Sequence, residues 1–289
     1  MKKFILLTGG ALITFCFANN VQAGCYAKEH YNAGINCLDS WNPGEANNCG
    51  DGCTYTYNNG KLTVTATKPD AVIPRYMFSP LYYEDGIFPN VKDIEISGKF
   101  DIIDADAFYA NLATISGKDG ILYVKDVINV AFAGNTLVGT IIVDEKKQRL
   151  GTEPWYSANL NATVILPPTI KSISGLALWG LNLGPNAKIY CGVENCEELF
   201  KNVDCEGFST NENNRTQCKN RLKTLLSSGK LLPYPDGCTK MGASGCTKCK
   251  NENFKLNDGE CDRLRWTPAE AAEVLKDDNT NSVTITFKK

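Results

Sequence analysis

Large apolar residues recur at an almost constant spacing through the middle of the chain. The last four of five such anchors are separated by 24, 23 and 23 residues. A fixed period in the range of about 20–50 residues is typical of proteins built from stacked repeats. The longer step of 30 residues between the first two anchors indicates an insertion over residues 79–90. The anchors are Phe78, Phe108, Phe132, Trp155 and Leu178.

Smaller apolar residues precede each anchor at common offsets. They lie 14, 12 and 5 residues before it, as Ile94, Ile96 and Ile103 do before Phe108. Two apolar side chains separated by one residue are typical of a short strand that buries one face. Neither a sustained helical spacing nor a heptad fits these positions. The corresponding residues of other turns are Val64, Ala66 and Ile73; Ile141, Val143 and Leu150; and Val164, Leu166 and Ile173.

This pattern predicts a mainly β solenoid with parallel strands over residues 61–190, made of about five turns. One turn cannot bury its own hydrophobic face, so neighbouring turns must stack and atypical segments must cap both ends. The third turn is expected to be irregular, because its strand, residues 121–124, is displaced relative to Phe132.

Three anchor segments resemble the bacterial BspA-like leucine-rich repeat. They read IDADAFYANL at residues 103–112, VINVAFAGNTL at 127–137 and VILPPTIKSISGLALWG at 164–180. In that family a strand ending in Leu-Pro precedes a spaced Ile-Gly and then Ala-Phe. The resemblance implies a leucine-rich-repeat solenoid and a secreted or cell-surface binding protein, adhesins included, with no catalytic motif. Pro154 and Trp155 depart from it, since they stand where the family has Ala-Phe.

The N-terminus has the features of a secretory signal peptide over residues 1–23. A basic start is followed by an apolar stretch over residues 4–18 and by the small-residue cleavage signal Val21-Gln22-Ala23. The apolar run is too short for a membrane anchor and is interrupted by Gly9 and Gly10. We therefore expect an exported protein, secreted or at the cell surface, with the periplasm as the alternative. Lipidation at Cys25 is a rival, although Gln22 fits a lipobox poorly.

Cysteines occur only outside the repeats. Of the 13 cysteines, Cys16 belongs to the signal peptide, which leaves 12. An even number in an exported chain indicates complete disulfide pairing. We expect one group before the repeats, one capping the solenoid and one in the tail, with the pairing inside each group left open. The groups are Cys25, Cys37, Cys49 and Cys53; Cys191, Cys196, Cys205 and Cys218; and Cys238, Cys246, Cys249 and Cys261.

The last group also fits a zinc knuckle, with Cys246 and Cys249 as one half and Cys238 and Cys261 as partners. An oxidising compartment disfavours this alternative, so we expect disulfides there and no metal or cofactor.

Helix-capping and turn signals in the rest of the sequence divide the chain into segments. A short helix is expected over residues 218–226, and a capping box at Thr267–Glu270 predicts a helix to about Lys276, followed by a strand over residues 282–287. The expected organisation is a signal peptide (1–23), a Cys-rich cap (24–60), the solenoid (61–190), a second cap with a linker (191–236) and a Cys-rich tail module (237–289).

Composition argues against several classes of partner and reaction. Without Lys2 and Lys3, 28 of the 30 basic residues remain against 32 acidic ones, and no basic run is present. This disfavours nucleic acid and anionic membranes as partners. Phosphate-binding loops, dinucleotide fingerprints and nucleophile-elbow motifs are missing from the sequence.

Catalytic residues are sparse. His30 is the only histidine and lies in the Cys-rich cap, away from any evident nucleophile. The carboxylates Asp101, Asp104 and Asp106 suggest a glycoside hydrolase by proximity alone, and acidic residues on solvated loops are the ordinary explanation. We therefore predict that the chain is not an enzyme, with a hydrolase as the less favoured alternative.

A binding role is the prediction that remains, with a protein or a glycan as partner in adhesion or host interaction. The residue between each inward strand pair should face solvent, and two such isoleucines on adjacent turns would form an apolar patch. The alternative for the patch is that a loop covers the two isoleucines. The alternative for the function is a structural role in the periplasmic envelope. The expected outward residues are Thr65, Glu95, Ile142 and Ile165, with a second, aromatic row at Tyr109, Tyr156 and Trp179.

Overall fold

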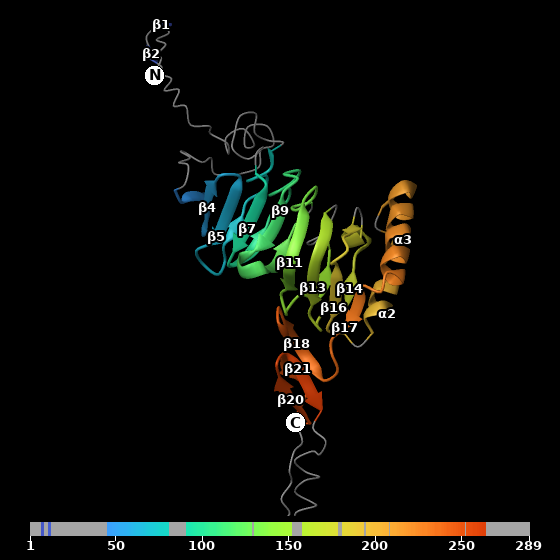
Figure 1. The fold of residues 1–289 in the computed structure, drawn as a ribbon. Coiled ribbons are helices and arrows are strands. Elements are labelled where there is room, and N and C mark those ends of the chain that lie inside the picture. Colours follow the sequence, from blue (N-terminus) through green and yellow to red (C-terminus); the bar gives the residue numbers. More distant parts are fainter. Residues whose placement is uncertain are drawn as a thin grey trace, which may run out of the picture.

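The computed structural model describes residues 7–8, 11–12, 45–80, 91–128, 130–151, 158–178, 181–193, 195–207, 209–251 and 253–263. These residues form a mainly β solenoid of about four turns, two helices at its C-terminal end and a small module of two hairpins (Figure 1). The fold class predicted from the repeat is confirmed.

An antiparallel meander opens the main sheet. Strands β3 (Asn47–Gly50), β4 (Cys53–Asn58) and β5 (Lys61–Ala66) pair in sequence order, and a Cys49–Cys53 disulfide closes the first turn. The β4–β5 turn is Asn59-Gly60, in which both residues have positive φ (49° and 85°). Asn-Gly is the preferred sequence for such a two-residue hairpin. A separate short pair consists of β1 (Leu7–Thr8) and β2 (Ala11–Leu12).

Parallel strands continue from β5 to the end of the solenoid. Ile94, Ile115, Leu137 and Leu160 are level on four successive strands, and all are buried. The strands of this main run are β7 (Asp93–Ser97), β9 (Thr114–Gly117), β11 (Thr136–Val143), β13 (Asn159–Leu166), β16 (Lys188–Cys191) and β17 (Leu231–Pro233). The remaining solenoid strands are β6 (Val72–Ile73), β8 (Lys99–Ile103), β10 (Ile121–Val127), β12 (Arg149–Leu150), β14 (Ser172–Ile173) and β15 (Asn182–Leu183).

The repeated anchors stack through the core. The rings of Phe78 and Phe108 are stacked with centroids 5.3 Å apart, and those of Phe108 and Phe132 are stacked at 5.8 Å. Tyr55 closes the column with an edge-on contact to Phe78 at 5.4 Å. Leu178 is also fully buried, whereas Trp155 lies outside the described residues. All of the smaller apolar residues that accompany the anchors are buried except Ala66, which packs against the core from a half-buried position.

Two buried asparagines, which the sequence analysis did not single out, support this column. Asn111 and Asn135 each follow a Phe anchor by three residues. The Asn135 amide donates to the carbonyls of Phe108 and Phe132 (2.6 and 3.1 Å), and its Oδ1 accepts from the Ala113 amide at 3.1 Å. Asn111 donates in the same way to Phe78 and Phe108. These bonds satisfy loop carbonyls that no strand pairs, as burial requires.

The third turn is irregular, as predicted. Strand β9 ends at Gly117 and a 3-10 turn, η3 (Lys118–Gly120), separates it from β10. A Cβ on Gly117 would lie 1.8 Å from the Ile121 carbonyl oxygen, and one on Gly139 would lie 2.4 Å from the Gly120 oxygen. Only glycine permits such close backbone approach, and at Gly139 it also supplies a φ of 80°.

The close backbone approach at Gly117 and Gly139 coincides with a change in the register of the strands. The first half of β11 pairs with β9 and its second half pairs with β10. Ile94 is therefore level with Leu137, whereas Ile141 is level with Leu122. The common offsets from the anchors identify the inward-facing residues, whereas the strand register changes at the third turn.

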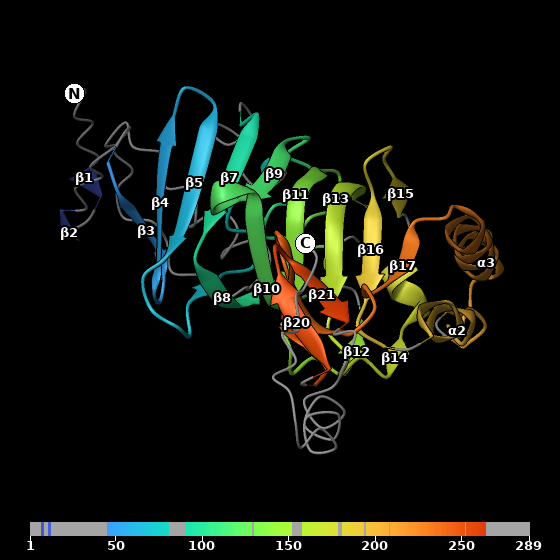
Figure 2. The ribbon, with the colours of Figure 1, turned by 60° about the horizontal axis from the view of Figure 1, so that its bottom comes forward.

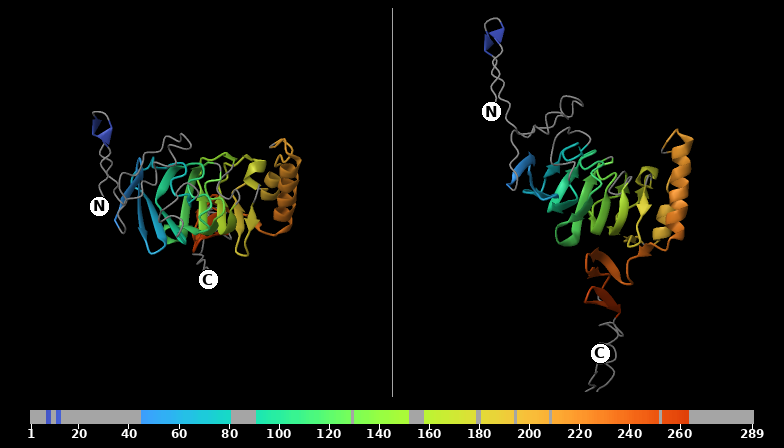
Figure 3. Two further views of the ribbon diagram at one scale, coloured as in Figure 1. Left: turned by 90° about the horizontal axis from the view of Figure 1, so that it is seen from above. Right: turned by 45° about the horizontal axis from the view of Figure 1, so that its top comes forward.

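The C-terminal end of the solenoid is capped by α2 (Cys196–Lys201) and α3 (Glu212–Ser227), with disulfides Cys191–Cys196 and Cys205–Cys218 (Figure 3). Helix α3 is longer than the helix expected over residues 218–226. It begins earlier because the Asn211 side chain accepts from the Asn213 amide and so caps the first turn. Among the described residues, no helix combines the length and apolar character needed to cross a membrane.

The tail module consists of two antiparallel hairpins, β18–β19 and β20–β21. Disulfide Cys238–Cys246 closes the first hairpin, and Cys249–Cys261 links the first hairpin to the second. Figures 1 and 2 place the module beside the middle of the solenoid, near β10, β11 and β13, although it follows the last strand, β17. Its strands are β18 (Cys238–Gly242), β19 (Gly245–Cys249), β20 (Phe254–Asn257) and β21 (Glu260–Arg263).

Several expectations fall outside the described residues. They are the signal peptide beyond the β1–β2 pair, His30, Cys25 and Cys37, most of the insertion over 79–90, and the helix and strand expected over residues 267–276 and 282–287.

Removing the central ring should destabilise the whole stack. We expect Phe108→Ala to lower the free energy of unfolding by about 3–5 kcal/mol, because it leaves a cavity between two stacked rings. Leu112→Ala is the control, since Leu112 is 84% exposed, and it should change little. Chemical denaturation followed by circular dichroism measures both; equal effects would contradict a stabilising aromatic column.

The side-chain amide of the buried Asn135 is expected to stabilise the fold through its hydrogen bonds. Asn135→Ala should lower the free energy of unfolding by about 1–3 kcal/mol, because the Phe108 carbonyl and the Ala113 amide lose their partner inside the core. Asn220→Ala on the exposed face of α3 should stay within about 0.5 kcal/mol of the parent protein. Denaturant titration of both variants compares a core amide with a surface one.

Candidate binding cleft

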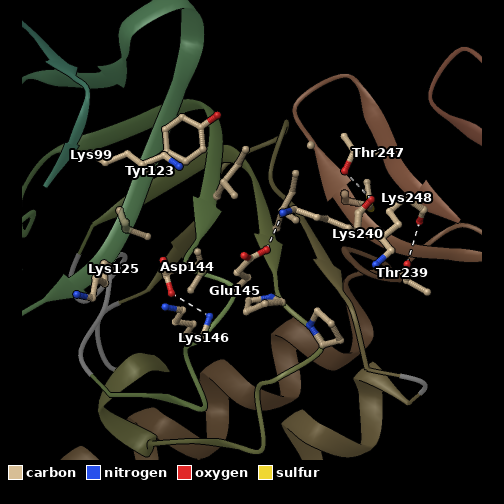
Figure 4. Close-up of a pocket in the computed structure, with 18 of the residues that line it drawn as sticks. Lys99, Tyr123, Lys125, Asp144, Glu145, Lys146, Thr239, Lys240, Thr247 and Lys248 are labelled. Atoms are coloured by element: carbon tan, nitrogen blue, oxygen red, sulfur yellow. Dashed lines mark hydrogen bonds and ion pairs between the residues drawn. The ribbon is translucent and has the colours of Figure 1, made fainter. Parts of the chain in front are cut away.

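A cleft of about 940 Å³ lies between the outer face of the solenoid sheet and the tail module. Strands β8, β10, β11 and β13 and the turns that follow them supply one wall, and the β18–β19 hairpin supplies the other (Figure 4). The polar residues around it are Lys99, Tyr123, Lys125, Asp144, Glu145 and Lys146 from the solenoid and Thr239, Lys240, Thr247 and Lys248 from the module.

Strand alternation explains why the solenoid residues share this face. Lys99, Tyr123 and Lys125 each lie on a strand next to a buried residue, so their side chains point away from the core, whereas Asp144, Glu145 and Lys146 follow the end of β11. Parallel pairing then places Lys99, Tyr123, Ile142, Ile165 and Tyr190 level with one another on successive strands. The row runs across the solenoid, and its first four residues form the floor of the cleft.

Only two of the four expected outward residues belong to this row. Ile142 and Ile165 are direct neighbours in it. Thr65 is level with Ser97, whereas Glu95 is level with Thr63 and Ser116 on the other side of the irregular turn. The four residues therefore do not lie in one row: Thr65 and Glu95 are already two residues out of register on β5 and β7, and Ile142 and Ile165 lie on strands after η3.

The two isoleucines do not form an exposed apolar patch. Ile165 is only 3% exposed, and Ile142 is half-buried. Tyr234 and Met241 line the same cleft, and Met241 is itself 9% exposed. The alternative of a covering segment is therefore the observed one, because the linker and the β18 hairpin return over this part of the sheet.

Two polar contacts hold the module against the solenoid. The Lys240 ammonium lies 2.6 Å from a Glu145 carboxylate oxygen, and the Tyr234 hydroxyl donates to the Leu166 carbonyl at 2.8 Å. The hydrogen bond from Lys240 lowers the pKa of Glu145, and the neighbouring charges of Lys146 and Lys99 add to this. Burial raises the pKa of Tyr234 to about 12. The first contact is exposed and screened by solvent, so the half-buried tyrosine is the stronger tether.

The cleft is positively charged although the chain is not. Five lysines line it (99, 125, 146, 240 and 248) against three carboxylates (101, 144 and 145), a balance of plus two, whereas the whole chain carries minus two. Lys125 is ion-paired with Asp101, and Lys240 with Glu145.

The other three lysines are not neutralised. Lys99 lies over the ring of Tyr123, 4.6 Å from its centroid. Lys146 and Lys248 are exposed, and their ammonium groups make no ion pair within the described part of the chain. The only other carboxylate, that of Asp144, accepts from the backbone amide of Lys146. Unpaired ammonium groups therefore dominate the electrostatics of the cleft.

The carboxylates considered for glycoside hydrolysis do not converge. Asp101 lines the cleft but is paired with Lys125. Asp104 accepts from the Ala105 amide, and Asp106 lies 3.8 Å from the Arg75 guanidinium. Burial raises the pKa of Asp106, while Arg75 opposes this shift. Each carboxylate thus has a separate structural partner.

Of the expected aromatic row, the structure describes Tyr109 alone. It lies at the solenoid loop after Phe108 and is half-buried, and its carbonyl accepts from the Ser79 hydroxyl at 2.9 Å. Tyr156 and Trp179 lie outside the described residues, so the row stays a prediction.

The tail cysteines lie close enough to be considered as metal ligands. The sulfurs of Cys238, Cys246 and Cys261 all lie within 4.8 Å of one another, and those of Cys246 and Cys261 are 3.3 Å apart. Each is bonded in a disulfide, however, so none is a thiolate that could bind zinc.

Comparison with known proteins adds no family to this description. No protein-family model, curated protein or solved structure matches the chain.

The cleft itself could not be found from the sequence, because lysines at outward strand positions are ordinary surface residues until the tail module is placed opposite them.

Removing the tyrosine hydroxyl should loosen the tail module. Tyr234→Phe is expected to lower stability by about 0.5–1.5 kcal/mol at neutral pH through loss of the bond to Leu166. Tyr109→Phe, whose hydroxyl has no such bond among the described residues, is the control.

The same tyrosine predicts an alkaline pH dependence. Its pKa is raised from 10.0 to about 12, so the protonated form is favoured by folding. Its contribution is fully present below about pH 10 and is lost as the pH rises toward 12. Chemical denaturation at pH 7 and at about pH 12 should therefore show that the free energy of unfolding falls less for Tyr234→Phe than for the parent protein. An equal fall in both proteins would contradict the raised pKa of Tyr234.

Proposed function

We propose that this chain is an exported solenoid protein, secreted or displayed at the cell surface, that binds a protein or glycan partner in the cleft. The observation that carries the proposal is the cleft itself, in which a solenoid face and a separate disulfide-linked module jointly surround a positively charged space. Solenoids typically use such extended faces for binding.

Two further features support export and binding. The five disulfides among the described residues indicate an oxidising environment, as is usual for extracellular proteins. The segments over residues 103–112, 127–137 and 164–180 resemble BspA-like leucine-rich repeats, whose members are secreted or surface binding proteins. Both point to the outside of the cell.

Catalysis is the less supported alternative. The separate pairing of Asp101, Asp104 and Asp106 offers no acid and base that face one substrate. Hydrolysis normally requires two carboxyl groups on opposite sides of the scissile bond. If the chain were nevertheless a hydrolase, alanine at Asp101 should abolish turnover.

A periplasmic structural protein is the second alternative. It would share the signal peptide and the disulfides, and it would use the same cleft for a component of the bacterial envelope. The two proposals differ in location, not in fold.

Location is tested with the tagged, full-length protein on intact cells. We expect added protease to digest it, or the culture medium to contain it, while a periplasmic marker stays intact. Protection of the protein until the envelope is opened, together with its absence from the medium, would overturn surface display and favour the periplasmic alternative.

A further inference from the structure

Resting on the proposed function, we propose that the ligand of the cleft is an acidic polysaccharide, a sugar chain that carries carboxylate or sulfate groups. Three observations lead to this ligand class: the charge of the cleft, the pairing of its hydrogen-bonding groups and the lack of a free strand edge on its solenoid wall.

Charge is the first observation. Lys99, Lys146 and Lys248 reach the cleft from both walls without a carboxylate partner among the described residues. The hydrogen bond and charge of Lys240 are the main causes of the lowered pKa of Glu145, and the charges of Lys146 and Lys99 add to this shift. A chain with a net negative charge that concentrates ammonium groups at one cleft fits an anionic ligand.

The hydrogen-bonding groups fit sugar hydroxyls. A hydroxyl both donates and accepts, so a site for sugars needs donors and acceptors side by side. Lysine ammonium groups alternate here with the carboxylates of Asp144 and Glu145. Thr239 and Thr247 already donate to backbone carbonyls, which leaves their oxygens as acceptors.

The solenoid wall of the cleft lacks the two features that most often bind peptides, a free strand edge and an exposed apolar groove. An extended peptide usually pairs with a free strand edge, and on the solenoid wall β10, β11 and β13 are each paired on both sides. On the other wall β18 pairs on one side only, with β19, so a free edge is limited to the tail module. An apolar groove is the other common mode, yet Ile165 and Met241 are almost fully buried. The cleft therefore combines an apolar lining with charged groups, and the unpaired lysines supply its positive charge.

The experiment measures binding of the whole protein to immobilised polymers of different charge. Heparin supplies sulfates, polygalacturonate supplies carboxylates, and dextran is neutral. We expect binding to at least one acidic polysaccharide that weakens as salt is raised from about 50 to 300 mM, because exposed charges are screened. Which polymer binds better distinguishes sulfate from carboxylate recognition.

Matched charge reversals locate the site. The double variant Lys146→Glu/Lys248→Glu should weaken binding at least about tenfold, since it reverses two unpaired charges of the cleft. Lys188→Glu/Lys223→Glu makes the same change of charge at exposed positions outside the cleft and should weaken binding less than about twofold. Circular dichroism and thermal melting check that both variants fold.

Three results would overturn the inference: equal weakening by both double variants, equal binding to dextran, or equal binding to polyglutamate, which would indicate an acidic peptide or a general polyanion site. These outcomes are separate from failure of the proposed function. A surface protein that binds no acidic polysaccharide would leave the proposed function intact, whereas a periplasmic protein that binds one would overturn surface display alone.

Discussion

Stacking of one turn on the next is the interaction on which this molecule depends. No turn is large enough to bury its own apolar face, so the Phe column and the flanking aliphatic residues form a core only when the turns are in contact. Phe108 has a stacked ring on either side, which places it at the centre of this arrangement. The buried asparagines serve the same end, because each bonds to carbonyls of its own turn and of the preceding one. Side-chain packing and backbone satisfaction therefore follow the same axis.

The irregular third turn has the largest consequence for the surface. Because the chain crosses itself closely at Gly117 and Gly139, the strands after this point pair in a different register from those before it. That shift brings Lys99 and Tyr123 into one row with Ile142 and Ile165. Without it, the charged and aromatic residues of the early turns would not lie beside the apolar residues of the later ones. A local backbone feature thus determines the composition of the cleft floor.

The tail module turns this floor into a cleft. It returns along the solenoid and places a second set of lysines and threonines opposite the first. The same return covers Ile165, which otherwise would be a candidate for apolar docking. A strand face that carries lysine, tyrosine and isoleucine side chains therefore becomes one wall of a positively charged cleft in the folded chain. This is the reason that the proposed ligand is acidic and hydrophilic.

The sequence by itself determined the repeat, the described anchors and their inward companions, the irregularity of the third turn and the grouping of the ten described cysteines. These features are periodic or local, and burial requires apolar side chains at fixed offsets. The sequence did not determine the strand register, because the offsets are counted along the chain whereas pairing depends on how the glycines let the backbone cross. Nor did it reveal Asn135 as a core residue, because Asn135 is stabilised there by hydrogen bonds to the carbonyls of Phe108 and Phe132, which belong to two different turns. The cleft belongs wholly to the tertiary structure: Lys146 and Lys248 are 102 residues apart in the chain, and only the return of the tail module gives them a shared space.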